Sequence, residues 1–113
     1  HSPLMESAVG GLSEAIDGAC FSEAEFSIYS NVTADAGTSA ERARALLLKQ
    51  LISPVRWADE VLAMAKAYPR ATYVEMGPGT VLVGLLRKIA PQLHAISCGG
   101  AADVQKLSEL VAA

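Results

Sequence analysis

The fold class is indicated most clearly by the stretch TYVEMGPGTVLVGLLRKI, residues 72–89. Its first five residues are mostly apolar, aromatic or β-branched, which predicts a buried strand over 72–76. Gly77 and Gly79 flank a proline and predict a tight turn. Leucines and an isoleucine then recur at helical spacing as far as residue 89, just before Pro91. The stretch therefore predicts a strand, a turn and a helix in succession.

Downstream of this stretch the pattern repeats. Residues 94–98, HAISC, predict a last short strand. A final helix is predicted by apolar residues at helical spacing, namely Val104, Leu107, Leu110 and Val111. Strands separated by helices favour parallel pairing through right-handed crossovers. We therefore expect an α/β class, in which short parallel strands alternate with helices packed on a small sheet.

Upstream of residue 72, three further helices are predicted. The first runs from Pro3 to Asp17, where apolar residues recur at helical spacing. The second follows Thr38 and Glu41, whose spacing is that of a capping box. The third begins near Trp57, after a proline that ends the second.

A strand and a turn are predicted between the first two of these helices. Residues 26–33, FSIYSNVT, alternate and are rich in aromatic and β-branched side chains, which favours a strand. The three residues after Ala34, Asp35 to Gly37, have the composition of a turn.

Composition and charge exclude several classes of function. Of 113 residues, 51% are hydrophobic and 19% charged, which is typical of a globular core former. The net charge is −3, and the nine lysines and arginines are scattered, so nucleic acid is not an expected partner. The uncharged stretch over Met76 to Leu86 is too short to span a bilayer, and no signal-peptide pattern is present. We therefore expect a cytoplasmic protein with no membrane partner.

The two cysteines predict neither a metal site nor a disulfide framework. Cys20 and Cys98 lie far apart in the sequence, with no CxxC or Cys/His ligand spacing. We expect both to be buried free thiols and expect no bound metal.

Few residues suit catalysis on their own chemistry. His1 and His94 alone titrate near neutral pH, so a general base of the usual kind would be one of them, and the residues alone do not choose between the two. No Gly-x-Ser-x-Gly nucleophile elbow is present, and the nearest matches place Ser13 within a helix and Ser39 at a helix cap. No serine of this chain is a candidate nucleophile.

Two weaker patterns have structural explanations. The glycines around Pro78 resemble a phosphate cradle, but the third glycine of a dinucleotide fingerprint is replaced by Leu82 and no P-loop lysine follows. A tight strand-to-helix turn explains this pattern better. The acidic residues at helix starts are explained by the helix dipole, namely Asp35, Glu41, Asp59 and Glu60.

Four blocks of sequence carry a family resemblance. HSPLM at 1–5, SNVTA at 30–34, KQLISPVRW at 49–57 and EMGPGTVL at 75–82 are similar to segments of the malonyl-CoA:acyl carrier protein transacylase family. Their order and spacing match over essentially the whole chain. One block alone would be weak evidence, whereas four in family order make a chance match improbable.

The resemblance implies a fold and a place within it. The family fold is an α/β-hydrolase-like large subdomain with an inserted ferredoxin-like small subdomain. Residues 1–113 would form the C-terminal portion of the large subdomain, beginning just after the insertion. The nucleophile elbow, the oxyanion-hole glutamine and the arginine that grips the malonyl carboxylate would all lie upstream.

The resemblance also implies a reaction and two site residues. The reaction is malonyl transfer from coenzyme A to the phosphopantetheine thiol of acyl carrier protein in fatty acid biosynthesis, by a Ser-His ping-pong mechanism. His1 matches the catalytic histidine, acting as general base and then acid, and Gln50 matches the residue whose main-chain carbonyl orients it. The role of Gln50 would therefore tolerate a change of side chain. Asn31 lies in a segment near the family's active site, with no chemical step assigned to it.

The expected partners follow from the same resemblance. They are acyl carrier protein, malonyl-CoA and the N-terminal remainder of the enzyme, with no cofactor beyond these substrates. The chain alone is expected to be inactive, since it has the histidine without the serine. Two other interpretations stay open: a piece of the acyltransferase domain of a polyketide or fatty acid megasynthase, and a non-catalytic α/β interaction module in which His1 is incidental.

Overall fold

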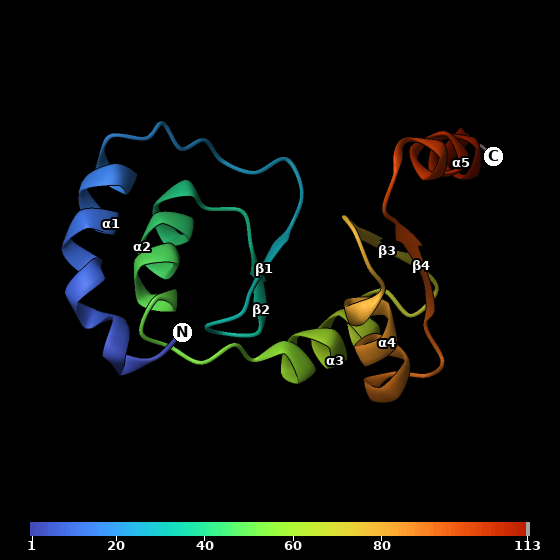
Figure 1. Cartoon of the computed structure of the whole chain (residues 1–113), viewed down its shortest axis with the longest axis horizontal. Helices are drawn as coiled ribbons and strands as arrows, with labels where there is room; N and C mark the ends of the chain where they lie inside the picture. Colours follow the sequence, from blue (N-terminus) through green and yellow to red (C-terminus); the bar gives the residue numbers. More distant parts are fainter. Residues whose placement is uncertain (113) are drawn as a thin grey trace. The chain divides into compact units, whose positions relative to one another are not determined.

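The computed structural model describes residues 1–112 (Figure 1). The chain divides into two compact units, with the boundary in the sequence between Ala63 and Met64. The N-terminal unit contains a 3-10 helix and two α-helices, η1 (Pro3–Ala8), α1 (Val9–Asp17) and α2 (Ala40–Gln50). It also contains a two-stranded antiparallel sheet of β1 (Ile28–Ser30) and β2 (Asp35–Gly37). The boundary between the units falls inside α3 (Trp57–Ala67).

The first predicted helix is present but changes type along its length. Ser2 caps its start, because its Oγ accepts a hydrogen bond from the backbone N–H of Leu4 at 3.3 Å. The six residues that follow are 3-10, and Val9 donates to the carbonyl of Glu6 in the tighter pattern. The α-helical part begins at Val9 and ends at Asp17, as predicted.

The predicted turn at Asp35 to Gly37 is wrong, because these residues form β2. The chain reverses earlier, between Ser30 and Asp35, and the predicted strand over 26–33 is correspondingly shorter. Ser30 holds this reversal, since its carbonyl accepts from the N–H groups of Thr33 at 3.2 Å and Ala34 at 2.7 Å. Ala34 adopts a left-handed φ of 58°, which supplies the reversal that a glycine usually provides.

The cap of α2 lies one residue later than the capping box predicted at Thr38 and Glu41. The cap of α2 is Ser39, whose Oγ accepts from the N–H of Arg42 at 3.2 Å. A second exposed N–H of the first turn, that of Ala40, is satisfied by the Glu23 carboxylate at 3.1 Å.

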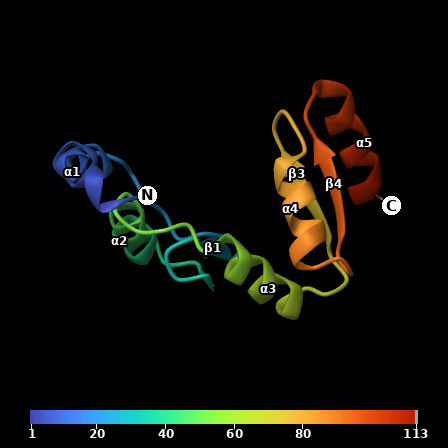
Figure 2. The same cartoon turned by 60° about the horizontal axis from the view of Figure 1, so that its bottom comes forward.

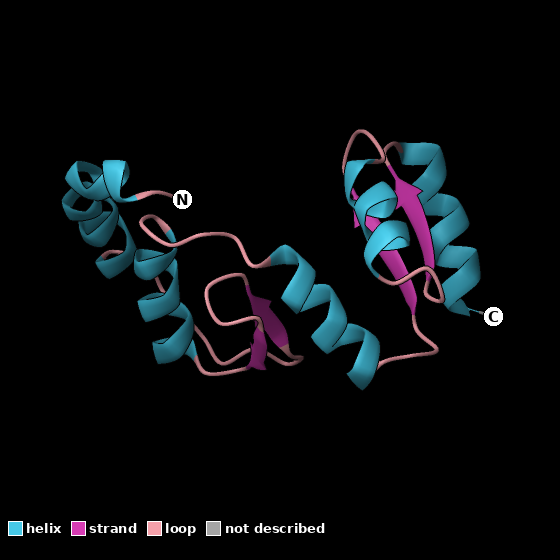
Figure 3. Ribbon diagram, turned by 90° about the horizontal axis from the view of Figure 1, so that it is seen from below, coloured by secondary structure: helices cyan, strands magenta, loops and turns pink. Residues whose placement is uncertain are grey.

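The C-terminal unit has the predicted parallel strands. β3 (Thr72–Met76) and β4 (His94–Cys98) pair in parallel, from Thr72 opposite His94 to Met76 opposite Cys98. The crossover helix α4 (Val81–Ile89) and the last helix α5 (Ala101–Ala112) lie on opposite sides of the two strands (Figures 1 and 2). Figure 3 shows the strand, helix, strand and helix in succession, which confirms the expected α/β class.

The core of this unit lies mainly under α4 and β4. Its buried side chains are Ala65, Val83, Leu86, Ala90, Leu93, Ala95 and Cys98. β3 is less buried than predicted, and Met76 at its end is 63% exposed. Within the described residues the sheet consists of β3 and β4 alone, and the buried side chains of the pair are on β4.

The turn between β3 and α4 depends on both glycines and on a carboxylate. Gly77 and Gly79 have φ of 124° and 99°, values that L side chains rarely adopt. The Glu75 carboxylate accepts from the backbone N–H groups of Leu82 at 3.0 Å and Val83 at 2.9 Å. A protein carboxylate therefore already satisfies the start of α4, which agrees with a structural turn and not with a phosphate cradle.

The prediction that both cysteines are buried is wrong for one of them. Cys98 is a buried free thiol on β4, whereas Cys20 is a free thiol exposed on the loop between α1 and β1. Within residues 1–112 no three His, Cys, Asp or Glu side chains gather as a metal site. No helix in that range has the length and apolar character needed to cross a membrane.

Candidate active site

The N-terminal unit brings His1 against the end of α2. The backbone N–H of Ser2 donates to the carbonyl of Leu51 at 3.2 Å, which ties the start of the chain to this helix end. His1 Nδ1 then lies 3.1 Å from the main-chain oxygen of Gln50. These residues are 49 positions apart in the sequence, so only the fold brings them together.

The last carbonyls of a helix have no partner within the helix, so the end of α2 is a natural acceptor. When Nδ1 of His1 carries the proton it donates to the Gln50 oxygen, and Nε2 is left with a free lone pair. Among the described residues, no hydrogen bond occupies Nε2 of His1 and no carboxylate is bonded to the ring. In this tautomer the imidazole is oriented by a carbonyl and has one nitrogen free to accept a proton.

The segment after α2 is fixed by its own hydrogen bonds. The N–H of Ser53 donates to the Gln50 carbonyl at 3.1 Å, and Ser53 Oγ donates to the carbonyl of Lys49 at 2.7 Å. The side chain of Gln50 folds back over this turn, and its Nε2 donates to the carbonyl of Ser53 at 3.1 Å and approaches that of Pro54 at 3.5 Å.

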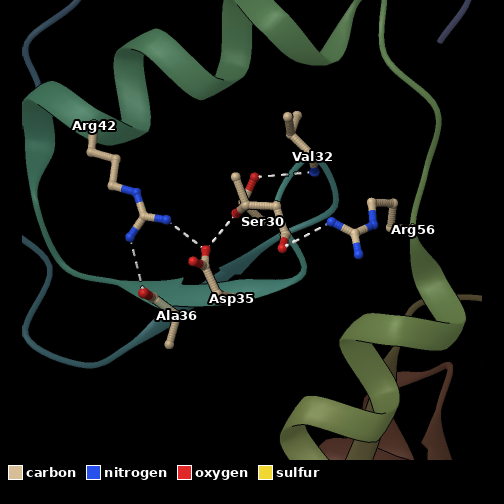
Figure 4. Close-up of polar contacts among 7 residues, drawn as sticks. Ser30, Val32, Asp35, Ala36, Arg42 and Arg56 are labelled. Atoms are coloured by element: carbon tan, nitrogen blue, oxygen red, sulfur yellow. Dashed lines mark hydrogen bonds and ion pairs between the residues drawn. The ribbon is translucent and has the colours of Figure 1, made fainter.

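The β1–β2 reversal is held by a second polar network, shown in Figure 4. Arg42 donates to the Asp35 carboxylate at 2.5 Å and to the carbonyl of Ala36 at 3.1 Å. The hydroxyl of Thr33 also donates to Asp35. The Thr33 hydrogen bond, followed by Arg42, lowers the pKa of Asp35 below its ordinary value despite an opposing desolvation effect.

The same reversal positions Asn31, whose carbonyl accepts from the N–H of Arg56 at 3.0 Å. Its side-chain Oδ1 is buried without a hydrogen-bond partner among the described residues. Asn31 and Gln50 both border a cavity of about 420 Å³, whose apolar lining includes Phe21, Ile28, Leu46 and Leu47. Nothing in the sequence pattern alone indicated this cavity.

The other candidates have structural positions. His94 is on β4, where its Nδ1 lies 3.3 Å from the Thr72 hydroxyl. Ser13 lies inside α1 and Ser39 caps α2, as expected. Asp59 pairs with Arg56 at 3.0 Å. Glu60 is buried, and desolvation raises the pKa of its carboxyl.

Comparison with known proteins identifies the family. No family model matches the chain. Over 97 residues, however, the chain is 36% identical to the malonyl CoA-acyl carrier protein transacylase of Bacillus subtilis, an alignment that covers 86% of the chain. The chain belongs to the malonyl CoA-acyl carrier protein transacylase family. The chain spans about a third of the length of the curated relatives it matches, and 30% of the Bacillus subtilis protein.

Solved structures of the family agree in fold. The malonyl-CoA:acyl carrier protein transacylase of Xanthomonas oryzae superposes with a TM-score of 0.85 at 32% identity, covering 97% of this chain and 35% of that one. A malonyl-transacylase solved in complex with a type II PKS acyl-carrier protein has the same score, identity and coverage. The expected α/β fold is therefore confirmed by the family as well as by the parallel strands.

Proposed function

We propose that this chain supplies the general base of a malonyl transfer from coenzyme A to the phosphopantetheine thiol of acyl carrier protein. The observation that carries the proposal is the contact of His1 Nδ1 with the Gln50 carbonyl, which leaves Nε2 free to take a proton. Membership of the transacylase family supports the choice of substrates. In this proposal the nucleophilic serine comes from outside residues 1–113, and the chain spans about a third of the length of its curated relatives.

The proposed reaction has two half-reactions. In the first, His1 Nε2 takes the proton of the serine hydroxyl as the serine oxygen attacks the malonyl thioester carbonyl. The same proton passes to the departing sulfur of coenzyme A, which leaves a malonyl-serine ester. In the second, His1 takes the proton of the carrier thiol as its sulfur attacks the ester, and returns that proton to the serine oxygen. His1 therefore ends each cycle neutral and ready for the next.

The end of α2 favours the charged state of His1 that forms during each transfer. The Gln50 carbonyl accepts the Nδ1 proton, and the helix C-terminus carries a partial negative charge that typically stabilises a nearby cation by about 0.3–1 kcal/mol. A positioned general base contributes on the order of 10² to 10⁴ in rate. No metal and no cofactor takes part in the proposed mechanism.

A second candidate is the same transfer to a carrier protein of polyketide biosynthesis. It is favoured by the malonyl-transacylase solved with a type II PKS acyl-carrier protein. That structure matches the chain with the same TM-score, 0.85, and the same identity, 32%, as the Xanthomonas oryzae enzyme. The two candidates share the chemistry of His1 and differ only in the carrier protein that accepts the malonyl group. Transfer rates to a carrier protein from each pathway would separate them.

The test uses the complete transacylase polypeptide that contains these residues, incubated with malonyl-CoA and followed by intact mass. We expect the wild type to gain one malonyl group and to pass it to carrier protein. His1→Ala should slow both steps by a factor on the order of 10² to 10⁴ with little loss of stability, because His1 is exposed. His94→Ala is the matched control and should transfer normally. Near-normal transfer by His1→Ala would refute the proposal.

A further inference from the structure

The C-terminal unit carries most of the unpaired positive charge of the chain. Residues 64–113 contain five lysines and arginines against three acidic residues, a formal charge of +2, whereas residues 1–63 contain four against nine, a formal charge of −5. The cations that form ion pairs are Arg42, Arg44, Arg56 and Lys106. Within the described residues the other five form none, and all of these except Lys49 lie in the C-terminal unit: Lys66, Arg70, Arg87 and Lys88.

The topology of this unit brings those four cations to one edge of its sheet. Lys66 is in the last turn of α3, and Arg70 lies between the end of that helix and the start of β3. Arg87 and Lys88 are in the last turn of α4, which crosses back from the end of β3 to the start of β4 (Figure 2). Because the two strands are parallel, both begin at this edge. The four side chains, all exposed, are called the basic edge below.

The acidic residues of the unit do not neutralise the basic edge. Glu75 and Asp103 are at the opposite edge, where the strands end, and both accept hydrogen bonds from backbone N–H groups there. Glu109 is on α5, which lies on the other side of the strands from α4 (Figures 1 and 2). The dipoles of α3 and α4 favour a cation at each helix end, but they do not supply four counter-charges.

An aromatic side chain lies within the same segment. Tyr68, between Lys66 and Arg70 in the sequence, is 49% exposed. Its backbone is fixed, because its carbonyl accepts from the hydroxyl of Tyr73 and from the N–H of Ala71, both at 3.2 Å. Tyrosine and arginine are the residue types that most often dominate the binding energy of protein interfaces. The basic edge therefore has the composition of a protein-binding surface.

We propose that the basic edge, together with Tyr68, docks an acidic face of the acyl carrier protein. The proposal rests on the proposed function for the identity of the partner, and a transacylase of the same fold has been solved with an acyl-carrier protein. A single phosphate is bound best at a helix start, and those of α4 and α5 are at the other edge and already hold Glu75 and Asp103. Cations spread over two segments instead match several carboxylates on one protein face, which they attract before contact.

The test uses the complete transacylase polypeptide, loaded from malonyl-CoA and then mixed with carrier protein that bears phosphopantetheine. The double variant Arg87→Glu/Lys88→Glu should lower kcat/KM for carrier protein about tenfold or more, because electrostatic steering raises association rates by about 10–10³-fold. Arg70→Glu should lower it by a smaller factor. Lys106→Glu is the matched control, because this exposed lysine of the same unit is outside the basic edge. Equal urea midpoints would show that all variants fold.

Two smaller reactants separate the protein face of the carrier from phosphate. Pantetheine has the thiol without protein or phosphate, and it should accept malonyl equally fast from the wild type and from Arg87→Glu/Lys88→Glu. Malonyl-CoA should load both at the same rate. Slower loading in the double variant than in Lys106→Glu would show that the basic edge binds the phosphates of coenzyme A. That result, slower transfer to pantetheine, or unchanged transfer to carrier protein would overturn the proposal.

A binding measurement separates this proposal from the proposed function. The anisotropy of fluorescently labelled carrier protein, titrated with the transacylase at roughly 0.05 M and 0.5 M salt, requires no chemistry. We expect the wild type to bind more weakly at high salt and the double variant to bind weakly at both. Equal binding by the two proteins would overturn the docking surface. If the wild type bound in this way but did not load malonyl, the proposed function would fail and the docking surface would stand.

Discussion

Replacing Glu75 should destabilise the C-terminal unit, because this residue caps α4 from the neighbouring strand. Thr80, at the usual capping position, makes no side-chain capping hydrogen bond. The two oxygens of Glu75 instead accept from the N–H groups of Leu82 and Val83 at 3.0 and 2.9 Å. Without the carboxylate, both N–H groups would have to bond to water, and the positive end of the helix would lose its counter-charge.

The expected loss of stability depends on how exposed the start of α4 is. Two buried hydrogen bonds to a charged group would contribute about 1.5–3 kcal/mol each. Val81 beside them is 70% exposed, so water can reach the first turn of α4 and replace part of the loss. The scale of a helix N-cap, about 0.5–2 kcal/mol, is therefore the better guide. We expect Glu75→Ala to cost about 2 kcal/mol and Glu75→Gln, which keeps one acceptor, about 1 kcal/mol.

Urea unfolding of the chain, monitored by circular dichroism, measures this loss. Glu109→Gln is the control, because it removes the same charge from an exposed position near the end of α5. The thermal midpoint of Glu75→Ala should fall by roughly 4–8 °C per kcal/mol lost, as for other small domains. If Glu75→Gln and Glu109→Gln unfolded at the same urea concentration, the carboxylate would not be capping α4 and the reasoning would be refuted.

Two further predictions concern the N-terminal unit. Burial raises the pKa of Glu60 above its ordinary 4.5. The stability contributed by its protonated form is therefore fully present below pH 4.5 and is lost as the pH rises through the folded pKa. In urea titrations, Glu60→Gln should stabilise the chain at pH 8 and have little effect at pH 4. Equal effects at both pH values would contradict this. Ala34 is buried and has a φ of 58°. Ala34→Gly should therefore change the free energy of unfolding by less than about 1 kcal/mol. The branched side chain of Ala34→Val should cost about 2 kcal/mol or more. Equal stabilities of these two variants would show that the left-handed turn is not strained.

The C-terminal unit was the more predictable from its sequence. The strands at 72–76 and 94–98 have the predicted bounds, because glycine and proline turns bracket them and the apolar pattern changes period between them. The capping role of Glu75 was not predictable, since its partners Leu82 and Val83 come within reach only after the turn has formed. Local pattern thus located the elements but not the contact between them.

The N-terminal unit departs from prediction where tertiary structure overrides local preference. The chain reverses at Ala34, which has no intrinsic preference for a left-handed φ, and this moved the predicted turn from 35–37 to the residues before it. The contact of His1 with Gln50 joins residues 49 positions apart, so no periodicity could indicate it. The family resemblance singled out both residues, but it gave the Gln50 side chain no part in the arrangement.

In the proposed mechanism, a helix end takes the place that an aspartate holds in a Ser-His-Asp triad. An aspartate beside the histidine orients the ring with a full charge, and that charge has to be desolvated and can itself be protonated. The Gln50 carbonyl offers only the partial charge of a helix C-terminus, but it is held by the backbone and does not titrate. Such an acceptor stabilises the imidazolium less than a carboxylate does, but as a pure acceptor it still favours the proton on Nδ1.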